Sequence, residues 1–159
     1  MSRLAVDRIV GANSESIINV PGHVVQVVNG TSSSDTEVTT NNYTDIGLSA
    51  SITPSSTNNK ILILVHVTTM AKFGGDTGLS AQLLRDSTSI IVFEGLAGDS
   101  GGTGSNATGG TGTTFLDSPA TTSSVTYKVQ IKNNNGAGTV RVHQSGASTS
   151  TMTLMEIAQ

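Results

Sequence analysis

The chain contains no cysteine and no tryptophan, and only 3% of its residues are aromatic. The absence of cysteine excludes a disulfide-stabilised scaffold. Charged residues are also scarce, at 12%, which is too few for a typical disordered chain that repels itself. The longest apolar run, Ile61 to Val65, is far shorter than the ~20 residues that a membrane-spanning helix needs, so we expect no membrane insertion.

Small polar residues make up much of what is present. Serine (21), threonine (23), glycine (18) and asparagine (11) together account for 73 of the 159 residues. These residues are poor helix formers, so long helices are not expected. The length suits one domain that can bury most of its apolar surface. The composition therefore favours a single β-rich domain with polar, turn-rich loops.

The distribution of charge argues against a nucleic-acid partner. The formal net charge is −3, and the 8 basic residues are scattered along the chain. No basic run is present to follow a phosphate backbone, and few aromatic rings are available to stack on bases. The first residues mix charged and aliphatic side chains and lack the continuous apolar core of a secretory signal, so we expect synthesis in a cytoplasm.

Strand signals recur from His23 to the C-terminus. Ile46 to Ile52 alternates apolar and small residues without interruption, which is the period-two pattern of a half-buried strand. Leu79–Leu84 and Ile90–Phe93 flank a polar turn and predict a hairpin. Further strands are expected at residues 23–28, 37–40, 60–67, 125–132, 140–143 and 151–157. About eight to ten short strands predict an all-β fold, an antiparallel jelly-roll-like β-sandwich.

The segment from Lys60 to Val67 differs from the other strands because both of its faces are apolar. One face carries isoleucine and valine, and the other carries Leu62, Leu64 and His66. Only one face of a sandwich strand meets the opposing sheet, so the second face needs another cover. We take Leu62, Leu64 and His66 as candidates for an interface in a homotrimer. The alternative is a central strand covered by a loop of its own chain.

The stretch from Gly95 to Thr114 contains eight glycines and almost no apolar side chains. It buries too little surface to offset the entropy of ordering, so we expect a long surface loop. Loops on a rigid scaffold commonly carry binding residues. The candidates for contact with a surface glycan are Asp99, Asn106 and Thr108 in this stretch, and Asn134 in the Asn-Gly-rich turn at residues 133–138.

No motif for catalysis, a cofactor or a metal emerges from the sequence. The glycine-rich stretch lacks the Lys-Ser/Thr of a phosphate-binding loop, and no Gly-x-Ser-x-Gly elbow is present. His23, His66 and His143 have no partners at metal-ligand spacing, although distant strands of a sandwich can assemble a site. We expect a non-enzymatic protein without cofactors, with His66 buried and hydrogen-bonded and His143 solvated.

Residues 1–20 precede the strand-rich region and form a separate unit in our prediction. Their apolar residues are interrupted by charges, and the turn signal Pro21-Gly22 follows them. We expect an N-terminal attachment arm at residues 1–20, with Leu4, Val6, Ile9 and Val10 as contact candidates, and a β-sandwich domain at residues 21–159.

Three stretches resemble a family of bacteriophage tail-fibre and virion-surface proteins, especially those of aquatic, cyanophage-like phages. They are Tyr43 to Leu62, Asp117 to Gln130 and Ser150 to Ala158, and together they place residues 21–159 in register with the family. The resemblance implies a β-sandwich knob that assembles as a homotrimer on the virion surface, and it brings no catalytic residues.

Two functions are consistent with these expectations. In the first, the protein is a trimeric surface knob of a tail fibre or short fibre that attaches to a glycan on the host surface. Trimerisation would strengthen weak binding through avidity. In the second, it is a capsid decoration protein or head fibre that docks on the shell through residues 1–20. The partners are then other copies of the chain and a further virion protein of the tail or capsid.

Overall fold

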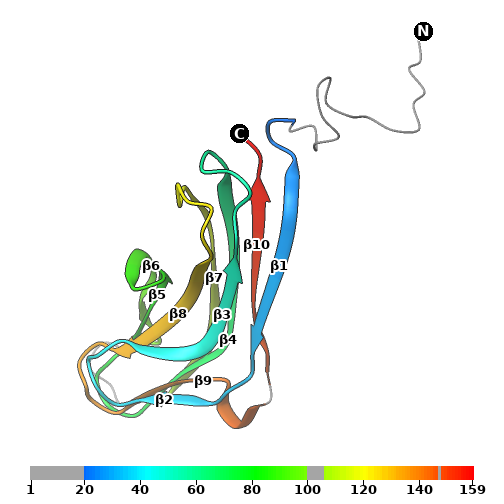
Figure 1. Cartoon of the computed structure of the whole chain (residues 1–159). Coiled ribbons are helices and arrows are strands. Elements are labelled where there is room, and N and C mark those ends of the chain that lie inside the picture. Colours follow the sequence, from blue (N-terminus) through cyan, green and yellow to red (C-terminus); the bar gives the residue numbers. More distant parts are fainter. Residues whose placement is uncertain (1–19, 100–105, 147) are drawn as a thin grey trace, which may run out of the picture.

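The computed structural model describes residues 20–99, 106–146 and 148–159, and the strands there form a two-layered β-sandwich (Figure 1). No α-helix is present in these ranges, and none of their elements is a long apolar helix that could cross a membrane. The elements are β1 (Val24–Ser32), β2 (Thr36–Val38), β3 (Thr44–Ile52), β4 (Lys60–Phe73), β5 (Leu79–Arg85), β6 (Thr88–Ala97), β7 (Ala107–Asp117), β8 (Val125–Asn133), β9 (Thr139–Val142), the 3₁₀ turn η1 (Gln144–Gly146) and β10 (Ser150–Ile157).

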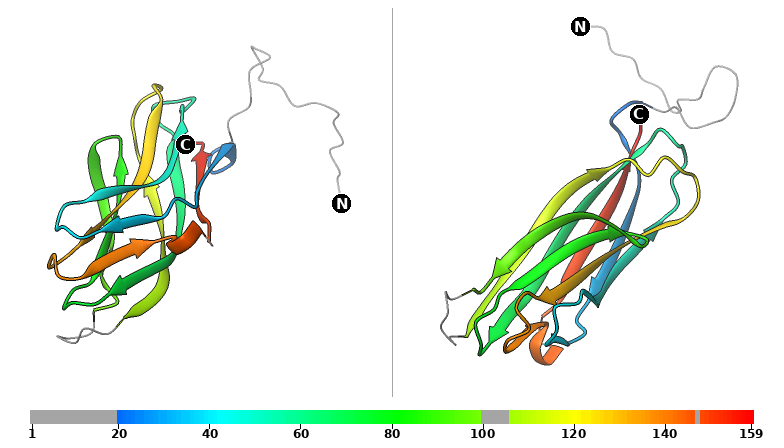
Figure 2. Two further views of the ribbon diagram at one scale, coloured as in Figure 1. Left: turned by 90° about the horizontal axis from the view of Figure 1, so that it is seen from below. Right: turned by 90° about the vertical axis from the view of Figure 1, so that its left-hand side faces the viewer.

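The strand order confirms the predicted antiparallel sandwich. One sheet runs β1-β10-β4-β9-β2, with β7 also paired to β4, and the other runs β3-β8-β5-β6. The long strands thus form two four-stranded layers, β1-β10-β4-β7 and β3-β8-β5-β6, which is the order of two interlocked Greek keys in a jelly roll. The short strands β2 and β9 extend the first layer beside the last residues of β4 (Figure 2).

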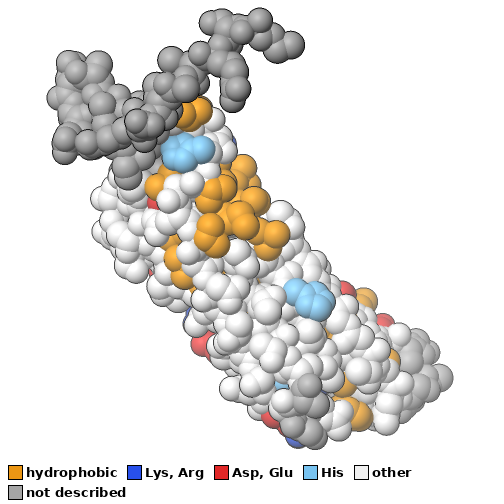
Figure 3. All heavy atoms as spheres, turned by 90° about the vertical axis from the view of Figure 1, so that its right-hand side faces the viewer, with side chains coloured by type: hydrophobic (Ala, Val, Ile, Leu, Met, Phe, Trp, Pro, Cys, Tyr) orange, Lys and Arg blue, Asp and Glu red, His pale blue; other side chains and the backbone are white. Residues whose placement is uncertain are grey.

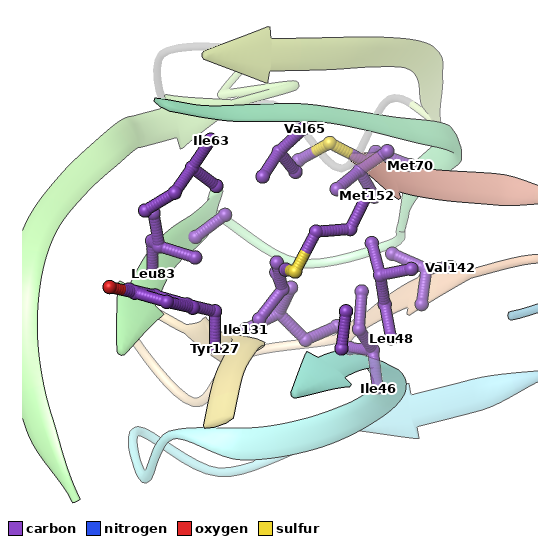
Figure 4. Packing of buried hydrophobic residues seen from close by; sticks show 14 of the residues in the cluster. Ile46, Leu48, Ile63, Val65, Met70, Leu83, Tyr127, Ile131, Val142 and Met152 are labelled. Carbon is purple, nitrogen blue, oxygen red and sulfur yellow. The ribbon is translucent and has the colours of Figure 1, made fainter. Parts of the chain in front are cut away.

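The core lies between the two layers and follows the alternation in the sequence. On β4, Ile61, Ile63, Val65 and Val67 are buried, as are Ile46, Leu48, Ala50 and Ile52 on β3. Figure 4 shows Ile63 and Val65 of β4 facing Leu83, Tyr127 and Ile131 from the opposite sheet. Each buried aliphatic side chain stabilises the fold by about 1.5–3 kcal/mol, so this alternation provides most of the driving force.

Two buried carboxylates fasten the edges of the sandwich. Glu156 on β10 accepts hydrogen bonds from Gln26 (2.6 Å), from Asn59 (2.6 Å) and from both the backbone N–H and the hydroxyl of Ser55 (2.7 Å each). Burial alone would raise the pKa of Glu156, but these donors outweigh it and lower the pKa below its usual value. The loop before β4 is therefore attached to β1 and β10.

Asp117 fastens the other edge, where β7 of one sheet meets β5 and β8 of the other. It accepts hydrogen bonds from the Tyr127 hydroxyl at 2.6 Å and from Arg85 Nη1 at 2.8 and 3.0 Å. Burial and the hydrogen bond to this carboxylate raise the pKa of Tyr127 well above its usual value. The tyrosine is therefore a permanent donor that ties the two sheets together.

The prediction of a surface loop from Gly95 to Thr114 is wrong at residues 95–97, which belong to β6, and at residues 107–114, whereas residues 100–105 lie outside the described residues. Residues 107–114 belong to β7, which pairs with β4 from Lys72↔Ala107 to Ile61↔Asp117. Residues 107–114 are held in the sheet by backbone hydrogen bonds to β4 and not by the burial of apolar side chains. The glycines suit the close packing, because a Cβ at Gly112 would lie 2.6 Å from the Val65 carbonyl oxygen.

Both expectations for the histidine environments are also wrong. His143 is fully buried, donating from Nδ1 to the Ser34 carbonyl (2.9 Å) and bonding through Nε2 to the Ser150 hydroxyl (2.5 Å). Its φ of 55° ends the alternation of β9, so the side chain turns inward. His66 lies on the outer face of β4 and is exposed. Its apolar neighbours in the sequence, Val65 and Val67, point into the core and therefore do not cover it.

Candidate functional site

The outer face of the β1-β10-β4-β7 layer brings together three rows of side chains, one from each strand in every row. The pairing of strands gives the rows Val27-Met155-Leu62-Leu116, Asn29-Thr153-Leu64-Thr114 and Thr31-Thr151-His66-Gly112. Leu62, Leu64 and His66 therefore lie on one face, as the sequence predicted. The first row is wholly apolar, and the other two add threonines around Leu64 and His66.

Large apolar side chains on this face are open to solvent. The exposed fraction is 56% for Val27, 50% for Leu116 and 38% for Leu64, and Val24 is also exposed. Figure 3 shows hydrophobic side chains gathered on this side of the molecule, toward the end at which the first described strand begins and the last one ends. Contiguous exposed apolar groups of this kind mark an interaction surface. No loop of the described residues covers them.

A depression of about 520 Å³ adjoins the apolar row on the same face. It forms where Gly112 has no side chain beside His66, and its rim carries hydroxyls. The lining residues are Leu64, Val65, His66, Gly112, Thr113, Thr114, Thr151 and Thr153. The face thus has both exposed apolar side chains and a depression lined by threonines, so it is not flat.

Sequence reasoning missed the partners of β4 on this face. Val27, Met155 and Leu116 lie beside Leu62 only because β1, β10 and β7 pair in that order. The alternation of each strand indicates which residues share a side, but it does not indicate which strands are neighbours. One signal was available in the sequence. Val27, Met155 and Leu116 are apolar residues on the side of their strands that otherwise carries polar side chains.

Three of the candidate loop residues follow β6, precede β7 or follow β8, and these strand ends lie at the end of the sandwich away from the C-terminus (Figure 1). Asp99 follows β6 in an exposed turn, and Asn106 precedes β7 and accepts a hydrogen bond from the Gly74 N–H at 3.0 Å. Asn134 follows β8 and donates to the Gly95 carbonyl at 2.6 Å. Thr108 does not belong to a loop, because it is an exposed residue of β7 opposite Ala71.

Asparagines hold the loops of this far end in place. The Asn133 side chain is buried, donates to the Ala137 and Gly138 carbonyls at 3.3 and 3.2 Å, and accepts from the Thr77 hydroxyl. Asn135 donates to the Asp76 carbonyl at 2.9 Å. The sequence predicted a turn at residues 133–138, but it did not predict these side-chain contacts. The far end therefore presents a braced polar surface, beside a cavity of about 230 Å³ lined in part by Met70, Leu79 and Ala97.

The described residues offer little for chemistry. Among them, no group of three His, Asp or Glu side chains lies close enough to hold a metal ion. His23, His66 and His143 lie on different parts of the sandwich: at the turn before β1, on the outer face of β4 and in the interior after β9. The arm candidates Leu4, Val6, Ile9 and Val10 lie outside the described residues.

Comparison with known proteins gives only distant likenesses. No protein-family model and no curated protein matches the chain. The infectious bursal disease virus VP2 subviral particle gives a TM-score of 0.43 at 10% identity, over 96% of this chain and 42% of that one. The Eiger TNF of S. frugiperda gives 0.41 at 8% identity, over 84% and 94%. The infectious bursal disease virus Gx strain gives 0.38 at 14% identity, over 100% and 42%.

This chain therefore spans less than half the length of each of the two viral chains. Because all three TM-scores lie below 0.5, we base the functional proposal on the residues of this chain and not on these likenesses.

Proposed function

We propose that this protein is a non-enzymatic structural protein of a bacteriophage virion, a trimeric surface knob of a tail fibre or short fibre that attaches to the host surface. The observation that carries the proposal is the separation of two surfaces on one rigid sandwich. An apolar face without a cover suits assembly, and a braced polar end suits recognition. The resemblance of residues 21–159 to virion-surface knobs supports the same assignment.

The orientation of the knob follows from its two ends. The backbone N–H of Gly22 donates to the Ala158 carbonyl at 2.8 Å, so the first and last described strands meet at one end. Attachment through residues 1–20 would hold this end against the particle. The loops with Asp99, Asn106 and Asn134 would then point away from the particle, toward a host glycan.

A capsid decoration protein is the second candidate. Val20, the last residue of the arm, is exposed, which suits docking of residues 1–20 on a shell as well as on a tail. In that case the knob would stand on the head, and its far end would add adhesion or stability. The two candidates share the fold, the assembly and the orientation, and they differ only in location.

Localisation on intact particles tests the proposal. Gold-labelled antibody against residues 20–159 should mark the tail or its tip if the protein is a fibre knob. Label over the head would make it a decoration protein, and deletion of residues 1–19 should then abolish binding to empty capsids. Absence of label from purified particles would contradict the virion assignment. Glycan arrays with the purified protein would next test recognition, with Asn106→Ala and Asn134→Ala compared with Ser49→Ala, an exposed residue within β3 and outside these loops.

A further inference from the structure

We infer that the outer face of β1, β10, β4 and β7 is the surface on which copies of this chain meet, with the row Val27-Met155-Leu62-Leu116 as its centre. This inference deepens the proposed function, since it names the partner of the apolar face as a second copy of the same chain. It extends the three candidates on β4 to residues contributed by all four strands.

The first argument is that the three rows at the centre of the face carry no charge. Within the described strands, none of the residues in these rows is Asp, Glu, Lys or Arg. Of the charged residues of these strands, Glu156, Asp117 and Lys72 are buried, and Lys60 lies on the outer face only at its margin, where it pairs with Ile157 at the start of β4. A surface that meets copies of itself must avoid like charges facing each other, and uncharged central rows satisfy this.

The second argument is the relief of the face. Val27 and Leu116 protrude from the two outer strands of the layer, and the depression beside Gly112 and His66 lies next to the apolar row. A neighbouring copy that carries the same residues can place a protruding group in this recess. Such head-to-tail contacts form a closed ring when the rotation between copies is 120°, which is the symmetry that a trimeric knob requires. Burial of the row also removes apolar side chains from water.

The chain provides matched controls for this inference. Val92 and Leu96 on β6 are exposed by 54% and 55%, close to the values of Val27 and Leu116, but they belong to the other sheet. We would purify the full chain with Val27→Asp, Leu116→Asp, Val92→Asp or Leu96→Asp and measure mass by light scattering and sedimentation. Circular dichroism and urea unfolding would identify any variant that fails to fold. If Val27→Asp fails to fold, the nearly isosteric Val27→Thr would replace it.

The expected result is that Val27→Asp and Leu116→Asp weaken association on the order of 100-fold or more, whereas Val92→Asp and Leu96→Asp leave it unchanged. Because the three central rows are uncharged, association of the unaltered chain should not weaken between low and high salt. Unchanged association in Val27→Asp and Leu116→Asp, equal loss in the two controls, or an assembly that dissociates at high salt would overturn the inference.

The outcomes also separate this inference from the proposed function. An unaltered chain that is monomeric at all concentrations would overturn the inference and the trimer together, while antibody label on particles could still support a virion protein. An unaltered dimer that Val27→Asp splits would support the face and contradict the trimer. An assembly on this face without label on particles would support the inference and contradict the virion assignment.

Discussion

On the outer face of the β3-β8-β5-β6 sheet, polar side chains are hydrogen-bonded across all four strands, whereas on the β1-β10-β4-β7 layer the outward residues are largely apolar or hydroxyl-bearing. Asp45 of β3 accepts from Lys128 and Gln130 of β8 at 3.0 and 2.8 Å. Gln130 in turn accepts from Gln82 of β5 at 2.8 Å, and Gln82 accepts from Ser89 of β6 at 2.8 Å. The polar side chains of the β3-β8-β5-β6 sheet are thus paired with one another, and its exposed apolar side chains, Val92 and Leu96, lie on the edge strand β6.

The β1-β10-β4-β7 layer has one comparable contact in its three rows, between Asn29 and Thr153 at 3.2 Å. Its apolar row gains nothing from solvent and would gain from a partner. The difference teaches that two sheets sharing one core can have unlike outer faces: one carries a network of paired polar side chains, and the other carries an apolar row with no cover among the described residues.

The largest expected effect comes from placing a charge at the centre of the apolar layer. Leu64→Asp should dissociate the assembly, because each copy would bury an unpaired carboxylate at a cost of several kcal/mol. Light scattering measures the mass of the variant. The matched change on the solvated sheet is Val92→Asp, and an unchanged mass for Leu64→Asp would remove the basis for the contrast.

A smaller effect is expected from Glu156, the acid that the apolar layer directs inward. Glu156→Gln places an amide donor where Gln26 or Asn59 also donates, which leaves a buried donor unpaired. The free energy of unfolding should fall by about 1–3 kcal/mol, as urea denaturation would measure. Glu37→Gln on the exposed face of β2 is the control and should change little. An equal loss in both variants would mean that the network around Glu156 contributes nothing specific.

The same residue predicts how stability depends on pH. The pKa of Glu156 is lowered in the folded chain, so its contribution is complete above the unfolded value near 4.5 and is lost as the pH falls through the folded value. Thermal unfolding from pH 7 to pH 3 should show a decline that Glu156→Gln flattens. If the variant and the parent decline in parallel, another carboxylate is responsible.

The smallest effect is expected on the solvated sheet. Asp45→Asn removes the ion pair with Lys128. The side chains of both residues are partly exposed. Surface pairs of this kind contribute less than about 1 kcal/mol, so urea unfolding should shift by that amount or less, and association should not change. A change in the oligomeric mass of this variant would show that the polar face also takes part in assembly.

The strands with regular alternation could be predicted from the sequence, and residues 46–52 and 60–67 lie in β3 and β4 as expected. β7 was missed because Thr-Gly repeats carry no apolar period, and its order depends on the backbone of β4. The orientation of His143 was missed because one positive φ reverses the side on which a residue faces. Leu62, Leu64 and His66 were placed on one face by period two alone, whereas their neighbours required the strand order.

The meeting of the first and last strands at one end has a mechanical consequence. Gly22 and His23 are hydrogen-bonded to Ala158, and from there β1 and β10 run side by side from Val24↔Ile157 to Ser32↔Ser150. If the knob is held at this end and pulled at its far loops, the tension runs parallel to these strands. Ladder hydrogen bonds lie perpendicular to the strands, so such a load shears many of them at once and does not peel them apart singly. In the proposed orientation, the pairing of β1 with β10 would therefore resist tension along the long axis of the sandwich.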